Sequence, residues 1–245
     1  MRAIILAAGY GRRIAAAHQG PKSLLAFGGK SLLQRHLENL ASRGIEHIAV
    51  CVGYEAGMLR EAIEASGHAT RVSTVLNPAY REGSVVSLWS MRHYLDAGGD
   101  VLLMDADVLC HPALLDRLQQ TAMPNCFLLD RDFEPGLEPV KLCVRAGALV
   151  EFRKQLAEGL QYDFAGESVG FFRLGEDMAR RLARKTEEYV GDGRREEPYE
   201  EAIRDLLLER PAEFGYEDVT GTPWVEIDFP EDIERAATKI LPQLT

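Results

Sequence analysis

Leu6-Ala7-Ala8-Gly9-Tyr10-Gly11-Arg12-Arg13, with Pro21-Lys22 shortly after it, is the stretch that decides the fold of this chain. The apolar run from Ala3 to Ala8 comes first and is typical of a buried strand. The two glycines then allow a turn that side chains would obstruct, and such a turn exposes backbone N–H groups that bind anions. Because two arginines and a lysine follow in the same loop, the stretch favours a polyphosphate over a single carboxylate.

Two simpler phosphate-binding motifs do not fit. The segment 9–14 lacks the third glycine of a dinucleotide-binding fingerprint. Gly29-Lys30-Ser31 resembles the end of a Walker loop, but Leu24 stands where the first glycine of that motif belongs. We therefore expect a turn before a helix at residues 29–31.

Strands and helices alternate through the first half of the chain. Apolar runs predict strands at 3–8, 47–52, 72–76 and 101–104, and apolar residues at helical spacing predict helices at 31–43, 55–65 and 84–95. This alternation predicts an α/β protein with a Rossmann-like, mostly parallel sheet and helices on both faces.

The second half has a looser pattern, which predicts a small mixed lobe over the carboxyl ends of the first sheet. Its expected strands are 127–129, 141–144, 149–152, 169–173 and 225–227, its helices are 176–189, 198–209 and 230–240, and 190–197 is an exposed loop. The whole chain, 1–245, is expected to form one domain, with a core at 1–125 and a second half at 126–245 that brings the chain back to the core.

Composition limits the classes of function. A net charge of −10 argues against nucleic acid as a partner. No apolar run approaches the roughly 20 residues of a membrane helix, and no signal peptide is apparent, so we expect a cytoplasmic protein with no membrane partner. The four cysteines are widely spaced, which favours buried thiols over a metal or disulfide framework.

Two acidic motifs follow apolar strands. Asp105-Ala106-Asp107 ends the strand at 101–104, and Glu226-Ile227-Asp228 follows Trp224. At the carboxyl edge of a sheet, such carboxylates would face whatever the glycine loop holds, and hard oxygen ligands beside a polyphosphate point to Mg²⁺. Each motif could also be a helix cap.

Together these motifs resemble the signature of nucleotidyltransferases that activate sugar phosphates and phosphoalcohols, the MobA-like NTP transferases, and in particular their phosphocholine cytidylyltransferase-like branch. The resemblance implies the nucleotide-diphospho-sugar transferase fold. It also implies that Asp107 and Asp228 bind Mg²⁺, with Asp105 in support. Lys22 would act at the α-phosphate, and Arg12 and Arg13 at the phosphates that leave.

The same resemblance implies two further groups of residues. Those expected around the nucleotide are Leu6, Ala8, Gly9, Gly11, Arg12, Lys22, Gly53, Ser84, Asp105 and Ala106. Those expected around the acceptor, within the half 126–245, are Lys141, Lys154, Glu167, Tyr199 and Trp224. The acceptor-side lysines could equally lie on a solvated surface, and the aromatic residues could equally be core.

The reaction that the resemblance implies is transfer of CMP from CTP to a small acceptor bearing a phosphate or phosphonate, such as phosphocholine, phosphoethanolamine or 2-aminoethylphosphonate. Three alternatives stay open: a sugar-1-phosphate or inositol-1-phosphate nucleotidyltransferase using UTP, dTTP or CTP; a non-catalytic nucleotide-binding regulator on the same fold; and a nicotinamide-dependent dehydrogenase, against which the missing third glycine counts. A homodimer is also left open.

Overall fold

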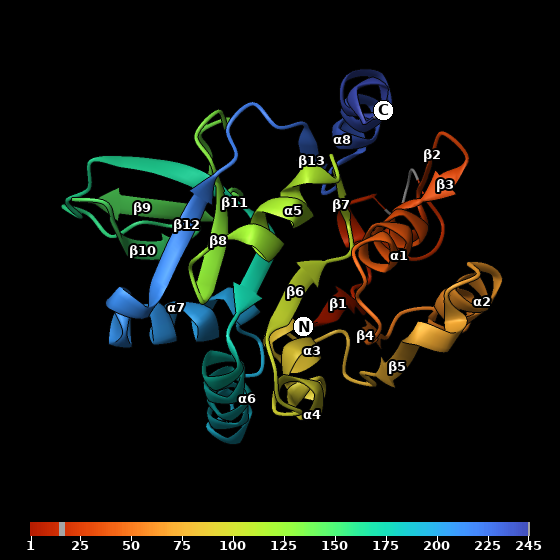
Figure 1. The fold of residues 1–245 in the computed structure, drawn as a ribbon, viewed down its shortest axis with the longest axis horizontal. Helices are drawn as coiled ribbons and strands as arrows, with labels where there is room; N and C mark the ends of the chain where they lie inside the picture. Colours follow the sequence, from red (N-terminus) through yellow and green to blue (C-terminus); the bar gives the residue numbers. More distant parts are fainter. Residues whose placement is uncertain (15–17, 245) are drawn as a thin grey trace.

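A computed structural model describes residues 1–14 and 18–244. Its main sheet has the strand order β10-β9-β11-β6-β1-β4-β5, and β8 joins it by pairing with β11 (Figure 1). The parallel strands are β1 (Arg2–Ala7), β4 (Ile48–Val52), β5 (Val72–Leu76) and β6 (Val101–Asp105). The strands of the second half are β8 (Asn125–Asp130), β9 (Lys141–Arg145), β10 (Ala148–Arg153), β11 (Phe164–Leu174) and β12 (Phe214–Asp218), which runs parallel to β8. The second half thus extends the first sheet with mainly antiparallel strands.

Helices cover both faces of this sheet, because the side chains of β1 alternate between two apolar cores. Ile4 packs in a core with α3 (Ser84–Ser90), α6 (Glu176–Gly191) and α7 (Tyr199–Glu209). Ala3 and Ile5 pack in the other core, which contains α1 (Leu32–Ser42), α2 (Ala56–Ala65) and α5 (Ala113–Gln120). Adjacent strand residues point to opposite faces, so the predicted α/β class with helices on both faces is confirmed.

Most element boundaries agree with the pattern of the sequence, and the differences have local causes. The helix expected at 84–95 is interrupted at Met91 and continues as α4 (Arg92–Leu95). The last helix begins as α8 (Pro230–Arg235) and changes to a wider π-turn over Ala236–Ile240. Ser31 caps α1 by accepting a hydrogen bond from the Gln34 N–H at 3.1 Å, so the expected turn before a helix is confirmed.

Five short elements of the described chain were not expected from the sequence. They are the hairpin of β2 (Ala26–Phe27) and β3 (Lys30–Ser31), the strand β7 (Val108–Cys110), the helix α5 and the strand β12. Strands of two or three residues are too short to show a period of two. In the described part of the chain, no helix combines the length and the apolar character needed to span a membrane.

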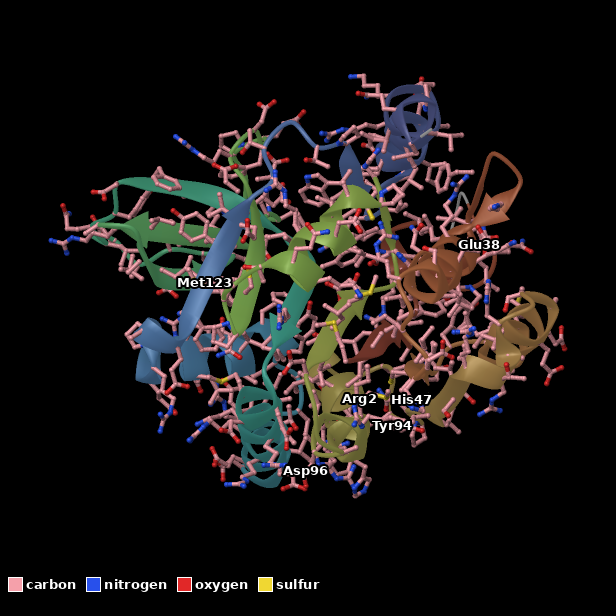
Figure 2. The ribbon with its side chains drawn as sticks, viewed as in Figure 1. Arg2, Glu38, His47, Tyr94, Asp96 and Met123 are labelled. Atoms are coloured by element: carbon pink, nitrogen blue, oxygen red, sulfur yellow. The ribbon has the colours of Figure 1, made fainter. Side chains whose placement is uncertain are left out.

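A small second sheet brings the end of the chain back to the first half. The strand β13 (Trp224–Glu226) pairs antiparallel with β7, and the Ile227 N–H donates to the Asp107 carbonyl at 3.0 Å. In Figure 1, β7, β13 and α8 lie together beyond the carboxyl end of β6. The opposite, amino ends of β1 and β4 are marked by Arg2 and His47 (Figure 2). A third apolar cluster, which includes Ile14 and Ile227, packs the small sheet of β7 and β13 against the segment that follows the glycine loop.

Candidate active site

A cleft of about 380 Å³ opens at the carboxyl ends of β1 and β6. The residues expected around the nucleotide that line it are Leu6, Ala8, Gly9, Gly11, Ser84 and Ala106. The charged residues expected at the reacting phosphates or the metal also line it: Arg12, Arg13, Lys22, Asp105, Asp107 and Asp228. One acceptor-side candidate, Tyr199, lies there too. Residues from positions 6 to 228 therefore share one cavity.

Gly11 sets the shape of the loop on one side of the cleft. Its φ of +62° is a left-handed conformation that L side chains rarely adopt. A β-carbon at this position would lie 2.9 Å from Cγ of Lys22. Gly11 therefore gives the loop its turn and also leaves room for the Lys22 side chain to cross it.

Three carboxylates converge in the same cleft. Asp107, Glu226 and Asp228 each offer a ligand oxygen, and these oxygens all lie within 4.8 Å of one another. The pairing of β13 with β7 produces this cluster by placing Glu226 opposite Val108, next to Asp107. Oxygens on opposite sides of a Mg²⁺ ion are about 4.2 Å apart, since each Mg–O bond is about 2.1 Å. The donor set is hard and close enough to fit Mg²⁺ after shifts of a few tenths of an ångström.

Lys22 lies between two of these carboxylates. Its Nζ is 2.6 Å from Oδ1 of Asp228 and 3.2 Å from Oδ2 of Asp107. Burial lowers the pKa of Lys22, but Asp107 and Asp228 outweigh it, so the pKa is raised above its ordinary value. Burial likewise raises the pKa of Asp228, but Lys22 outweighs it and the pKa falls. Both groups therefore stay charged at neutral pH.

Asp105 is held beside the cluster by contacts from distant parts of the chain. The Tyr199 hydroxyl donates to its Oδ2 at 2.7 Å. Gly170, with a φ of +79°, lies against the same carboxylate, which a β-carbon there would overlap. Burial first, and then Asp107, raise the pKa of Asp105 well above its usual range, and the same two causes raise the pKa of Glu226. The site thus brings four carboxylates together, and the two with raised pKa values, Asp105 and Glu226, take up a proton more readily than usual.

Another part of the cleft wall is built from small and hydroxyl side chains. Gly53 packs directly on Ala8 and Tyr80, with no room for a β-carbon, so it shapes the wall from behind. The Ser84 Oγ accepts from the Tyr199 N–H at 2.9 Å. Ser87, which also lines the cleft, accepts from the buried Asn77 side chain at 3.0 Å. These bonds connect α3, α7 and the loop after β5.

The other acceptor-side candidates lie apart from the main cleft. The Lys141 ammonium donates to three backbone carbonyls, those of Gly136, Pro139 and Lys154, at 2.7 to 3.1 Å. Because an ammonium has three donors, Lys141 as it stands holds a loop in place. Lys154 lies 3.3 Å from Glu138 and borders a separate cavity.

Glu167 and Trp224 border a second cavity of about 300 Å³, which shares Glu226 and Asp228 with the main cleft. The Trp224 indole is buried and donates to Asp130 at 2.7 Å. Burial, and then Asp130, raise the pKa of Glu167 to about 7. The five acceptor-side candidates therefore do not line one common cavity.

The sequence interpretation did not include Glu226 among the candidate metal ligands, although a signal was present. Glu226-Ile227-Asp228 has two acidic residues flanking one apolar residue, the same spacing as Asp105-Ala106-Asp107. Glu200, Tyr80 and Glu82 also line the cleft. They come from helix and loop positions whose approach to β1 depends on the tertiary fold, and no local pattern marks them.

Comparisons with known proteins identify a family for the chain. A sequence model described as the MobA-like NTP transferase domain matches residues 3–166. The chain is 26% identical over 251 residues to a CMP-5'-(3-aminopropyl)phosphonate synthase of Streptomyces rubellomurinus, covering 99% of this chain and 39% of that protein. It is 24% identical over 262 residues to a CTP:phosphoglutamine cytidylyltransferase of Campylobacter jejuni, covering 96% of this chain and 98% of that protein.

Among solved structures, the CTP:phosphocholine cytidylyltransferase of Streptococcus pneumoniae is similar, with a TM-score of 0.74 and 20% identity. The match covers 96% of this chain and 97% of that one, and it shows a shared fold. The chain spans only 39 to 52% of the length of the first curated relatives that it matches.

Proposed function

The chain belongs to the MobA-like NTP transferase family, and we propose that it is a cytidylyltransferase, which transfers CMP from CTP to a small phosphate or phosphonate acceptor and releases pyrophosphate. One observation carries the proposal. The carboxylates of Asp107, Glu226 and Asp228 converge within 4.8 Å on the cleft that the glycine loop and Lys22 also line. That arrangement suits a triphosphate, because the cationic loop and a divalent cation held by these carboxylates would both stabilise its negative charge.

The reaction needs orientation and charge stabilisation more than acid–base chemistry. An oxygen of the acceptor phosphate or phosphonate, already anionic near neutral pH, attacks the α-phosphorus. The new O–P bond forms as the bond from the α-phosphorus to the β-phosphate oxygen breaks, and pyrophosphate leaves with the electron pair. Lys22 stabilises the charge on the α-phosphate oxygens, while Arg12 and Arg13 bind the departing phosphates.

Mg²⁺ is the cofactor that this donor set fits, and Asp107, Glu226 and Asp228 would hold it. When bound, the ion neutralises the phosphate anions that would otherwise repel each other. Asp105 and Tyr199 position the turn that carries Asp107, because their bond of 2.7 Å fixes the end of β6 against α7.

The choice of CTP and acceptor draws on the relatives. Their printed names specify CMP or CTP and acceptors that carry a phosphonate or phosphate group. The second cavity beside the metal cluster contains Glu167 and Asp130, which suits an acceptor with a cationic head group such as an aminoalkylphosphonate or phosphoethanolamine. We assign nucleotide binding mainly to residues 1–125 and acceptor binding mainly to 126–245.

A release assay for pyrophosphate tests the proposal. The protein is incubated with Mg²⁺ and each of CTP, UTP, dTTP, ATP and GTP, against phosphocholine, phosphoethanolamine, 2-aminoethylphosphonate, inositol 1-phosphate and glucose 1-phosphate. We expect turnover with CTP and an amine-bearing acceptor. Preference for UTP or dTTP with a sugar phosphate would favour the alternative transferase. Tight nucleotide binding with no turnover in any combination would favour a regulator on the same fold.

A further inference from the structure

The position between the candidate metal ligands is already taken by a cation of the chain itself. The Lys22 ammonium lies 2.6 Å from Asp228 and 3.2 Å from Asp107, two of the three carboxylates that converge there. Only 15% of its side chain is exposed. A charge so placed makes the contacts with Asp107 and Asp228 that a bound divalent cation would make.

Arg13 completes this internal neutralisation. Its guanidinium lies 3.1 Å from Oδ2 of Asp228, the oxygen that Lys22 leaves free, and 3.0 Å from Glu138. The same group stacks 5.0 Å from the centre of the Phe229 ring. Both oxygens of Asp228 are therefore paired with cations that belong to the glycine loop or to the loop that follows it.

We propose that Lys22 and Arg13 keep the metal position filled in the nucleotide-free protein and leave it only when a triphosphate attracts them, so that the site takes its divalent cation together with the nucleotide. This inference rests on the proposed function for the metal role of the three carboxylates. It assigns Lys22 two positions: on Asp107 and Asp228 before binding, and on the phosphates afterwards.

The physical basis is competition for the same charges. A free divalent cation must displace the ammonium, whose positive charge repels it and which then loses both carboxylate partners. A triphosphate offers Lys22 and Arg13 new anionic partners. Releasing the carboxylates then costs less free energy than it does when a free divalent cation binds alone. Gly11 lies directly under the Lys22 side chain without a β-carbon, which leaves the methylene chain space to turn. Because coupling between two ligands is reciprocal, the cation should raise nucleotide affinity by the same factor.

Binding of Mn²⁺ to the nucleotide-free protein tests this inference without any turnover. Free Mn²⁺ is measured by electron paramagnetic resonance for the wild type and for Lys22→Met. We expect Lys22→Met to bind Mn²⁺ at least tenfold more tightly, and Arg13→Met to show a smaller gain because Arg13 is 45% exposed. Lys30→Met removes the same charge from an exposed pair with Glu38 and should leave the affinity unchanged.

A second variant locates the bound ion. Adding Asp107→Asn to Lys22→Met should abolish the gain, and thermal unfolding of each variant confirms that it is folded. Equal or weaker Mn²⁺ binding by folded Lys22→Met and Arg13→Met would overturn the inference. A gain that survives Asp107→Asn would overturn the metal assignment itself. If the gain appears as expected but the wild type turns over no nucleotide, the inference stands and the proposed activity fails.

Discussion

Replacing Asp107 with Asn should separate activity from stability. The change keeps the size of the side chain but removes one negative charge from the cluster. We expect turnover to fall by at least a hundredfold, about 2.7 kcal/mol of transition-state stabilisation. The folded protein should nevertheless be about as stable as the wild type, because like-charge repulsion at this position nearly cancels the attraction to Lys22.

The balance can be worked from distances. At an effective dielectric constant of about 20, the attraction of Asp107 to Lys22 at 3.2 Å is about 5 kcal/mol. Repulsion from Asp228, at no more than 4.8 Å, is about 3.5 kcal/mol or more. Glu226 adds a similar repulsion only in its ionised form, and burial, followed by Asp107, raises its pKa well above the usual range. Attraction and repulsion at Asp107 therefore differ by no more than about 2 kcal/mol, and solvent screening lowers this difference. Each kcal/mol changes Tm by about 2–4 °C in a protein of this size.

Pyrophosphate release and thermal unfolding, both measured on Asp107→Asn, check this prediction. Asp116→Asn is the matched control, since Asp116 pairs with Arg43 away from the cleft. The control should keep its turnover and lose some stability. Turnover near that of the wild type in Asp107→Asn, or a fall of Tm by more than about 5 °C, would refute the reasoning by showing that Asp107 serves the fold.

Three further outcomes follow from individual contacts. Gly170→Ala should displace the Asp105 carboxylate, lower kcat more than it raises KM, and lower Tm; unchanged kcat would show that the close packing at Asp105 is not needed. The buried His36 has a pKa lowered from 6.5 to about 4, chiefly by burial. As the pH drops, this histidine is protonated first in the unfolded chain, where its pKa is the ordinary one. The free energy of unfolding should therefore fall by up to about 3 kcal/mol between pH 7 and pH 4. Urea unfolding should show that the stability of His36→Gln depends less steeply on pH than that of the wild type. An identical pH dependence would contradict the assignment of this effect to His36. Because the pKa of Glu167 is raised to about 7, its burial destabilises the protein as the pH rises through 4.5 to 7. Glu167→Gln should therefore raise Tm at pH 8 but not at pH 5, whereas an equal rise at both values would assign the effect to packing.

The core of the fold could be predicted because its signals are local. These signals are the apolar run before Gly9, the helical spacing of apolar residues in α1 and the glycines of the loop, and each acts within a few residues. The cleft contains most of the residues that the loop and its neighbouring motifs indicated. The carboxyl ends of β1 and β6 meet at one edge, so the glycine loop and Asp107 had to be neighbours.

The rest depends on pairings that the sequence does not mark. The Tyr199 hydroxyl reaches Asp105 from 94 residues away, and Glu226 joins the cluster only because β13 pairs with β7. Lys141 illustrates the opposite case: the family resemblance implied a position around the acceptor, but nearby carbonyls occupy its three donors. Residue type and spacing therefore predict which groups are available, while the tertiary structure decides which of them meet.

A crystal structure with Mn²⁺ and a non-hydrolysable CTP analogue tests the central claim most directly. Anomalous scattering should place the ion on oxygens of Asp107 and Asp228, with Nζ of Lys22 moved from these carboxylates to the phosphates. An ion bound elsewhere, or a Lys22 that still bridges Asp107 and Asp228 with the nucleotide in place, would contradict it.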